Sequence, residues 1–352
     1  MWQSNFHYYA ALSLPNGDQV GEVRLKVDWI PALRWAEFER YLKDSNIEPS
    51  SASAVIEPIW DPEGTPPYIG GAGIRLDKER AVAVSFPLSY FSAALSAASS
   101  QLIASGALSV GQEIAYRIYA LADERPQPRA DCGVAIVALD EPPAIETADL
   151  SSLLSEARMV SSIGGDENGN SDPADSTRMP VLVPQLVLDE ATALGQQVGD
   201  IETGGILVGK LLRGADGTLF SRVTAQIPVE HTAATQRSLR FTHATWASVD
   251  AAISLRARDE IPLGWWHSHP EFCHLCSPEQ RALCPLAVPL FSQADKDLHR
   301  EVFQQPWSIG LLLSFLGKKQ PSYDVFAWHR GQIEAVNFFI LPGEARHSGV
   351  SP

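Results

Sequence analysis

Cysteine is scarce in this chain of 352 residues, which contains four, three of them crowded between positions 273 and 284. A secreted disulfide framework would instead spread an even number of cysteines over a short chain. This usage favours a reducing, cytoplasmic setting. Basic residues are also few: 27 Lys and Arg stand against 42 Asp and Glu, and the formal net charge is −15. Because such a surface repels phosphates, nucleic acid is not an expected partner.

Long hydrophobic runs are missing as well. No stretch approaches the roughly 18 consecutive apolar residues that a membrane-spanning helix needs. The first residues, MWQSNFHYYAALSLPNGD, lack the basic start and apolar run of a signal peptide. Neither export nor a membrane partner is therefore expected.

The length and the 45% hydrophobic content predict two domains of about 150 residues, each with its own core. Between them, residues 151–180 are poor in large apolar side chains from Gly164 onward and rich in Gly, Asn, Asp, Ser and Pro. Such a segment buries too little surface to offset its ordering entropy, so we interpret it as a linker. The predicted domains are residues 1–150 and residues 181–345.

The N-terminal domain is predicted to be α+β. Apolar residues alternate with charged ones over 23–29, which indicates a half-buried strand, and Pro31 opens a helix. The other predicted elements are strands at 81–86, 113–121 and 133–139 and a helix at 88–103. No spacing of His, Cys, Asp or Glu here is typical of a catalytic or metal site, so we expect this domain to contact a partner or substrate.

The C-terminal domain is predicted to be α/β, with a mixed sheet flanked by helices. The predicted helices are 189–197, 244–258 and one that begins after Ser292. The predicted strands are 204–208, 220–227, 263–267, 309–315, 323–328 and 335–340.

His267 and His269 lie in the sequence Gly-Trp-Trp-His-Ser-His-Pro, from residue 264 to residue 270. In extended backbone these two side chains point to one face, where two imidazoles can share a zinc ion. A pair of this kind also occurs on solvated strand ends, so it indicates a metal site only together with further ligands.

Asp295 is the third candidate ligand, and the pattern Ser292-x-x-Asp295 opens a predicted helix. One interpretation is a capping box, in which the serine and the acid bind unpaired backbone N–H groups. The other is that the helix start directs the carboxylate at a metal. Two His and one Asp would leave tetrahedral zinc an open position for water.

Glu202 directly precedes the apolar strand predicted at 204–208. A Glu at this position is ordinarily exposed at a strand edge. Beside a metal it could instead act as a general base that takes a proton from water.

Together these residues resemble the motif of the JAMM, or MPN-plus, metalloprotease family of the Mov34 type: a Glu, then His-Ser/Thr-His-Pro, then Ser-x-x-Asp. The resemblance covers about residues 181–345 and includes Glu-x-Gly-Gly at the acid. It implies that His267, His269 and Asp295 bind a catalytic Zn²⁺. It further implies that Glu202 is the catalytic acid and base and that Ser292 helps to hold the oxyanion.

The sequence departs from the family at one point. The family places about ten residues between the second His and the Asp, whereas 25 residues separate His269 from Asp295 here. Since ligands need to be close only in space, an outward loop can accommodate the difference. Asp297 is the nearby competitor for Asp295, but it lacks a Ser at the matching offset.

The insertion at 271–291 contains Cys273, Cys276 and Cys284. A Cys-x2-Cys spacing with a third cysteine nearby is typical of a structural zinc site. Three reduced thiols that fill the core of a small loop are the alternative. A fourth zinc ligand could come from His274, His299 or His243.

The resemblance also implies a function. Most members of this family cleave the isopeptide bond between the C-terminal tail of a ubiquitin-like protein and a lysine, and some bacterial members process precursors. By analogy we expect a bacterial deubiquitinase-like isopeptidase that works beside E1-like and E2-like proteins in a conjugation operon, such as one of antiviral defence. The alternative is a catalytically silent MPN scaffold that only binds other proteins.

Overall fold

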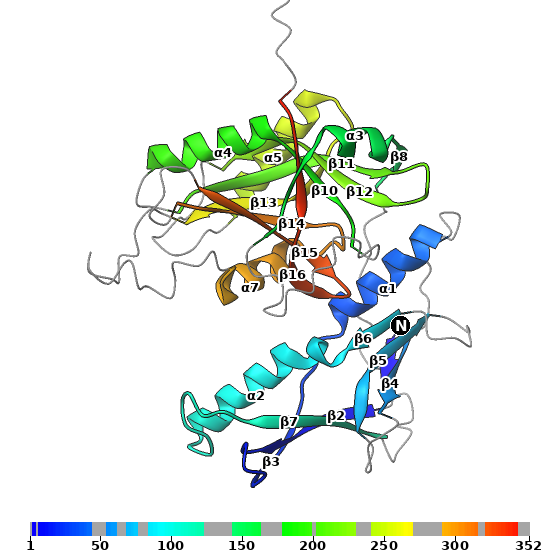
Figure 1. Ribbon diagram of the computed structural model, residues 1–352, viewed down its shortest axis with the longest axis vertical. Helices are drawn as coiled ribbons and strands as arrows, with labels where there is room; N and C mark the ends of the chain where they lie inside the picture. The colour runs from blue at the N-terminus through cyan, green and yellow to red at the C-terminus, as the bar shows by residue number, and fades with distance from the viewer. Residues whose placement is uncertain are drawn as a thin grey trace, which may run out of the picture. The chain divides into compact units, whose positions relative to one another are not determined.

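The computed structural model describes residues 2–4, 6–43, 54–61, 68–76, 84–122, 143–162, 178–198, 202–229, 241–269, 291–315 and 321–343. The chain divides into two compact units, shown as ribbons in Figure 1. The first contains Met1–Pro142 with Arg330–Gln332, and the second contains Pro143–His329 and Ile333–Pro352.

The first unit combines two sheets with helices. Strands β1 (Trp2–Ser4), β4 (Ala54–Trp60), β5 (Ile69–Leu76) and β6 (Val84–Pro87) form a sheet in the order β1-β4-β5-β6. Strands β2 (Phe6–Ser13), β3 (Gln19–Arg24) and β7 (Ala115–Ala122) form another in the order β3-β2-β7. The helices are α1 (Ile30–Lys43), the 3-10 turn η1 (Leu88–Phe91) and α2 (Ser92–Ala104). The predicted α+β class is confirmed.

The prediction of a strand over 23–29 was wrong beyond Arg24, where β3 ends. Leu25 and Trp29 are nevertheless 5% exposed, and the ring of Trp29 stacks on Tyr90 at 5.4 Å. The alternating pattern therefore reflects burial in the core rather than strand pairing. The strand predicted at 133–139 lies outside the described residues.

The second unit is built on one large mixed sheet. Its strand order is β16-β15-β14-β13-β11-β12-β10-β17-β9, and β8 pairs with β11. The strands are β8 (Glu146–Thr147), β9 (Arg158–Val160), β10 (Val181–Pro184), β11 (Gly204–Arg213), β12 (Leu219–Pro228), β13 (Ile261–His269), β14 (Ile309–Ser314), β15 (Ser322–His329), β16 (Gln332–Val336) and β17 (Phe338–Leu341). The helices are α3 (Leu150–Glu156), α4 (Gln185–Val198), α5 (His243–Arg256) and α7 (Gln293–Val302). The predicted mixed sheet flanked by helices is confirmed.

The linker predicted at 151–180 begins too early. Residues 150–160 form α3 and β9, and β9 pairs with β17 in the large sheet. Leu150 is the reason, because it is buried in a cluster with Leu182, Leu212, Phe220 and Leu341. The few apolar side chains in this stretch therefore suffice to attach it to the core. Residues 163–177 lie outside the described part of the chain.

Strand β13 occupies an interior position in the sheet, antiparallel to β11 and parallel to β14. Its approach to β14 requires glycine at position 264, where a Cβ atom would lie 1.8 Å from the carbonyl oxygen of Ile309. Helices α4 and α7 lie on opposite sides of these strands (Figure 1). This arrangement buries both faces of β13 and places its C-terminal end beside the start of α7.

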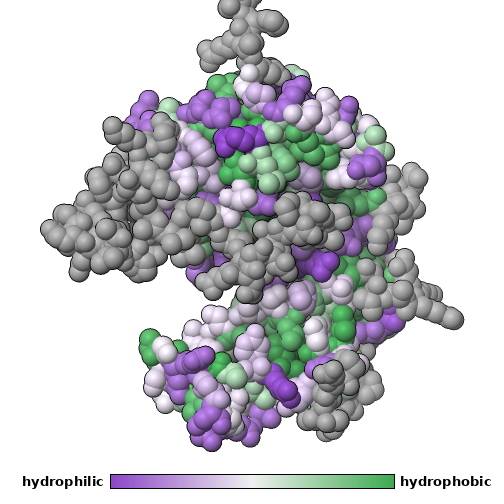
Figure 2. Space-filling model, viewed as in Figure 1, coloured by the Kyte–Doolittle hydropathy of each residue, from purple (hydrophilic) through white to green (hydrophobic). Residues whose placement is uncertain are grey.

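Within the described residues, no helix is both long and apolar enough to cross a membrane. On the face drawn in Figure 2, hydrophilic and hydrophobic residues are interspersed.

Candidate metal centre

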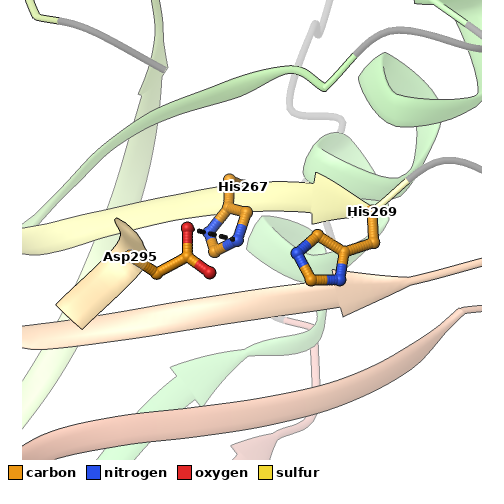
Figure 3. Close-up of side chains that lie close together, drawn as sticks. All are labelled: His267, His269 and Asp295. Carbon is orange, nitrogen blue, oxygen red and sulfur yellow. Dashed lines mark ion pairs between the residues drawn. The ribbon is translucent and has the colours of Figure 1, made fainter. Parts of the chain in front are cut away.

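The two histidines lie at the C-terminal end of β13 and share one face of the strand (Figure 3). Their ring centroids are 5.1 Å apart. His267 is 1% exposed, and its ring stacks on Trp265 with a centroid distance of 4.6 Å. The predicted geometry of a same-face pair is therefore present, but at a buried strand end rather than a solvated one.

Asp295 reaches this pair from the first turn of α7. The backbone N–H of Ser292 donates to Oδ2 of Asp295 at 2.7 Å, and the N–H of Asp295 donates to Oγ of Ser292 at 3.2 Å, which completes a capping box. Oδ1 of Asp295 lies 3.4 Å from Nε2 of His267 (Figure 3). The two interpretations of Ser-x-x-Asp are thus compatible, since each uses a different carboxylate oxygen.

Asp297, the competing acid, points elsewhere. Its Oδ1 accepts hydrogen bonds from Gln293 at 2.7 Å and from Arg300 at 3.2 Å, and its side chain is 55% exposed. The structure therefore brings Asp295, and not Asp297, to the histidines.

The electrostatics of Asp295 and His269 favour the protonation states that a metal needs. Burial raises the pKa of Asp295, but the neighbouring His267 and the hydrogen bonds within the capping box outweigh it and hold this pKa below its usual value. Burial, reinforced by His267 and opposed by Asp295, lowers the pKa of His269 to about 4. At neutral pH the acid is ionised and this imidazole is neutral, as metal coordination requires.

The donor set and its spacing fit a zinc ion. One ligand atom from each of His267, His269 and Asp295 lies within 4.8 Å of the others, and this is the single group of its kind in the described part of the chain. Neither ring nitrogen of His267 has a hydrogen-bond partner, although both are buried. Two ligands bound tetrahedrally at about 2.1 Å lie about 3.4 Å apart, so small movements would close the set around one ion.

Glu202 lies beside this group because of the pairing between β11 and β13, which sets Gly204 opposite His267. Burial raises the pKa of Glu202 to about 7, with His267 lowering it and Asp295 raising it. A carboxyl group that titrates near neutrality can both take up and release a proton. The sequence-based alternative of an exposed strand-edge Glu does not hold, since the side chain is partly buried.

Ser268 is a site residue that the sequence analysis did not single out. It is fully buried, its N–H donates to the carbonyl oxygen of Thr203 at 2.8 Å, and its Oγ accepts from the N–H of Thr203 at 3.3 Å. Both hydrogen bonds join Ser268 to Thr203, the residue that follows Glu202, and so hold Thr203 in place. The signal was present in the motif, because the residue between two same-face histidines must point to the opposite face of the strand.

The predicted second zinc site is not described by the structure. Cys273, Cys276 and Cys284 lie outside the described residues, as does His274. Of the other two candidates, His243 is exposed at the start of α5, whereas His299 is completely buried and accepts a hydrogen bond from Trp265.

Comparison with known families supports the resemblance. Residues 176–280 match the family described as JAB1/Mov34/MPN/PAD-1 ubiquitin protease. The second unit contains an MPN domain. The match includes Glu202 and both histidines of the MPN domain and ends before Ser292 and Asp295, which the structure brings to the same place.

Further comparisons add little. A search of curated proteins found no match. Among solved structures, the solution structure of protein DSY2949 from Desulfitobacterium hafniense is 18% identical, with 48% of this chain and 97% of that chain covered and a TM-score of 0.31. A likeness at that level supports no conclusion about this chain.

Proposed function

We propose that the MPN domain is a zinc-dependent peptidase that cleaves the amide bond following the C-terminal tail of a ubiquitin-like protein. The observation that carries this proposal is the group formed by the buried His267 and the partly buried His269 and Asp295, with Glu202 beside it. Three ligands that leave a coordination position open, next to a partly buried acid, are typical of catalytic rather than structural zinc sites.

His267, His269 and Asp295 would hold the metal. A bound zinc ion would supply a Lewis acid, which polarises a carbonyl oxygen and lowers the pKa of water. The carboxylate of Glu202 would accept a proton from the attacking water and return it to the leaving amine. The Oγ of Ser292 accepts the N–H of Asp295 and keeps its own hydroxyl proton to donate to the developing oxyanion.

The proposed substrate is supported by the family match at residues 176–280 and not by a groove among the described residues. The family description names a ubiquitin protease, and an extended tail could bind beside a strand of the sheet. The bond cleaved would be an isopeptide bond to lysine or the linear bond of a precursor. E1-like and E2-like proteins of a conjugation operon, such as one of antiviral defence, are the proposed partners, with residues 1–150 as a contact region.

The test uses the full chain loaded with zinc and a ubiquitin-like protein whose C-terminal glycine is joined to a lysine side chain. We expect release of the free tail by the wild type and a loss of several orders of magnitude in turnover for Glu202→Gln, with zinc retained. Zinc binding without cleavage of either linear or isopeptide-linked substrates would instead support a silent scaffold.

A further inference from the structure

Between the described residues of β13 and α7 there are two polar contacts of interest, and one of them involves the ligand set. The first is the approach of His267 to Asp295 at 3.4 Å. The second joins Trp265 to His299, whose Nδ1 lies 3.1 Å from the indole Nε1. Trp265 precedes His267 by two residues on the same strand face, and His299 follows Asp295 by one helical turn. The two contacts therefore lie one after the other along the same strand and the same helix.

The chemistry of the second contact fixes the direction of its hydrogen bond. An indole N–H can only donate, so Nδ1 of His299 must accept, and the imidazole must be neutral with its proton on Nε2. His299 is fully buried, and burial lowers its pKa to about 3. The neutral, accepting form is therefore the one present at physiological pH.

Trp265 also packs directly on a metal-ligand candidate. Its ring lies parallel to that of His267 at a centroid distance of 4.6 Å and an interplanar angle of 12°. Phe303, at the C-terminal end of α7, is parallel to the same indole at 6.0 Å and 9°. Trp265 thus contacts both the imidazole of His267 and the helix that carries Asp295.

The ligand candidates come from two different elements, since His267 and His269 lie on β13 and Asp295 lies on α7. His269 and Asp295 are separated by 25 residues in the sequence, so their separation along the chain does not by itself bring them together. Among the described residues, the contacts of Asp295, His299 and Phe303 join α7 to β13. We infer that His299 is a positioning residue of the metal centre: by accepting the Trp265 hydrogen bond, it holds Asp295 within reach of the metal that His267 and His269 bind.

This inference rests on the metal centre of the proposed function, and it is tested by zinc affinity rather than by catalysis. The full chain is titrated against a chelator of known affinity, and the relevant zinc equivalent is the one that His269→Ala abolishes. His299→Leu should weaken binding by about 10- to 100-fold, the usual effect of losing a residue that orients a ligand. Trp265→Phe should weaken zinc binding to a similar extent. The double variant should bind zinc no less tightly than the weaker-binding single variant, because each of the three variants lacks the same Trp265–His299 hydrogen bond.

Two further variants separate positioning from general stability. His299→Asn offers an oxygen near the place of Nδ1 and should recover most of the affinity. Trp266→Phe is the matched control, since it loses an indole hydrogen bond to Gln226 on the other face of the same strand. It should retain wild-type zinc affinity even if its melting temperature falls.

The outcomes distinguish this inference from the proposed function. Wild-type zinc affinity in His299→Leu, or equal weakening in Trp266→Phe, would overturn the positioning role. Failure of the wild type to bind zinc would overturn both claims. Tight zinc binding by the wild type with no peptidase activity would overturn the proposed function alone.

Discussion

Asp295 faces His267 with one carboxylate oxygen while its other oxygen caps the helix on which it lies. Oδ1 is 3.4 Å from Nε2 of His267, and Oδ2 accepts the N–H of Ser292 at 2.7 Å. A carboxylate can serve both partners because each oxygen has its own lone pairs. The capping bond orients the side chain and thereby presents the free oxygen to the histidines.

Because the two carboxylate oxygens of Asp295 have different partners, two substitutions of this residue should have different effects. Asp295→Asn keeps a carbonyl oxygen for the cap but presents a neutral amide to the histidines, so it should lose zinc and retain most of its stability. Asp295→Ala should lose zinc and also about 1 kcal/mol of stability in the metal-free protein. Chelator competition and urea unfolding would measure the two effects. Equal unfolding free energies for the two variants would contradict the capping role.

Ser268→Ala should separate the position of Glu202 from metal binding. The substitution removes the Oγ that accepts the N–H of Thr203, and Thr203 adjoins Glu202. We expect unchanged zinc content and a kcat about 10-fold lower, because small displacements of a proton-transfer group are costly. An unchanged kcat would show that the backbone bond to Thr203 suffices to hold Glu202.

Much of the second unit could be predicted from its sequence, because its strands and helices follow clear patterns of burial. The placement of His267 and His269 on one face was equally readable, since extended backbone fixes which side chains share a face. The place of Glu202 beside them came from the resemblance to the family motif. The sequence did not show whether Asp295 caps the helix or binds a metal. Both roles use the same Ser-x-x-Asp pattern, so the pattern alone does not separate them.

Other features depend on contacts that no local pattern reveals. The bond between Trp265 and His299 joins residues 34 positions apart. The helix at Leu150–Glu156 was missed because a short segment with few apolar side chains resembles a linker until its packing partners are known. In the first unit, Leu25 and Trp29 are buried although they lie outside any strand, so their spacing gave the alternating sequence pattern that is typical of a strand.

Glu260 predicts a pH dependence of stability. Hydrogen bonds from Arg256 hold its pKa below the usual value, and Thr224 donates to it at 2.6 Å. An acid with a lowered folded-state pKa contributes stability above its unfolded pKa and loses it as the pH falls through the folded value. Glu260→Gln should therefore cost about 1–3 kcal/mol at pH 7, and the difference from wild type should shrink below about pH 4.5.

The control for Glu260 is the exposed ion pair of Glu146 with Lys210. Glu146→Gln should cost less than about 1 kcal/mol. The free energies of unfolding of both variants and of the wild type are measured by chemical unfolding across the pH range and compared. A constant difference between wild type and Glu260→Gln down to pH 3 would contradict the assignment of an ionised, stabilising carboxylate.

Gly264→Ala tests the strand pairing that supports the site. The added Cβ would lie 1.8 Å from the carbonyl oxygen of Ile309, so β13 and β14 would have to separate. We expect a loss of about 3 kcal/mol or more, or no folded protein. Gly343→Ala, where a Cβ meets nothing within 4 Å, should stay within about 0.5 kcal/mol of wild type. Similar thermal unfolding of the two variants would refute the close approach.

The central claim is that His267, His269 and Asp295 together bind one zinc ion. Its most direct test is the zinc content of the purified full chain compared with that of His269→Ala, each measured alone and with Cys273 and Cys276 replaced by Ser to remove any contribution from the cysteines. The account predicts that His269→Ala lowers the content by one equivalent in both backgrounds and that Glu202→Gln leaves it unchanged. Equal zinc content with and without His269 would contradict it.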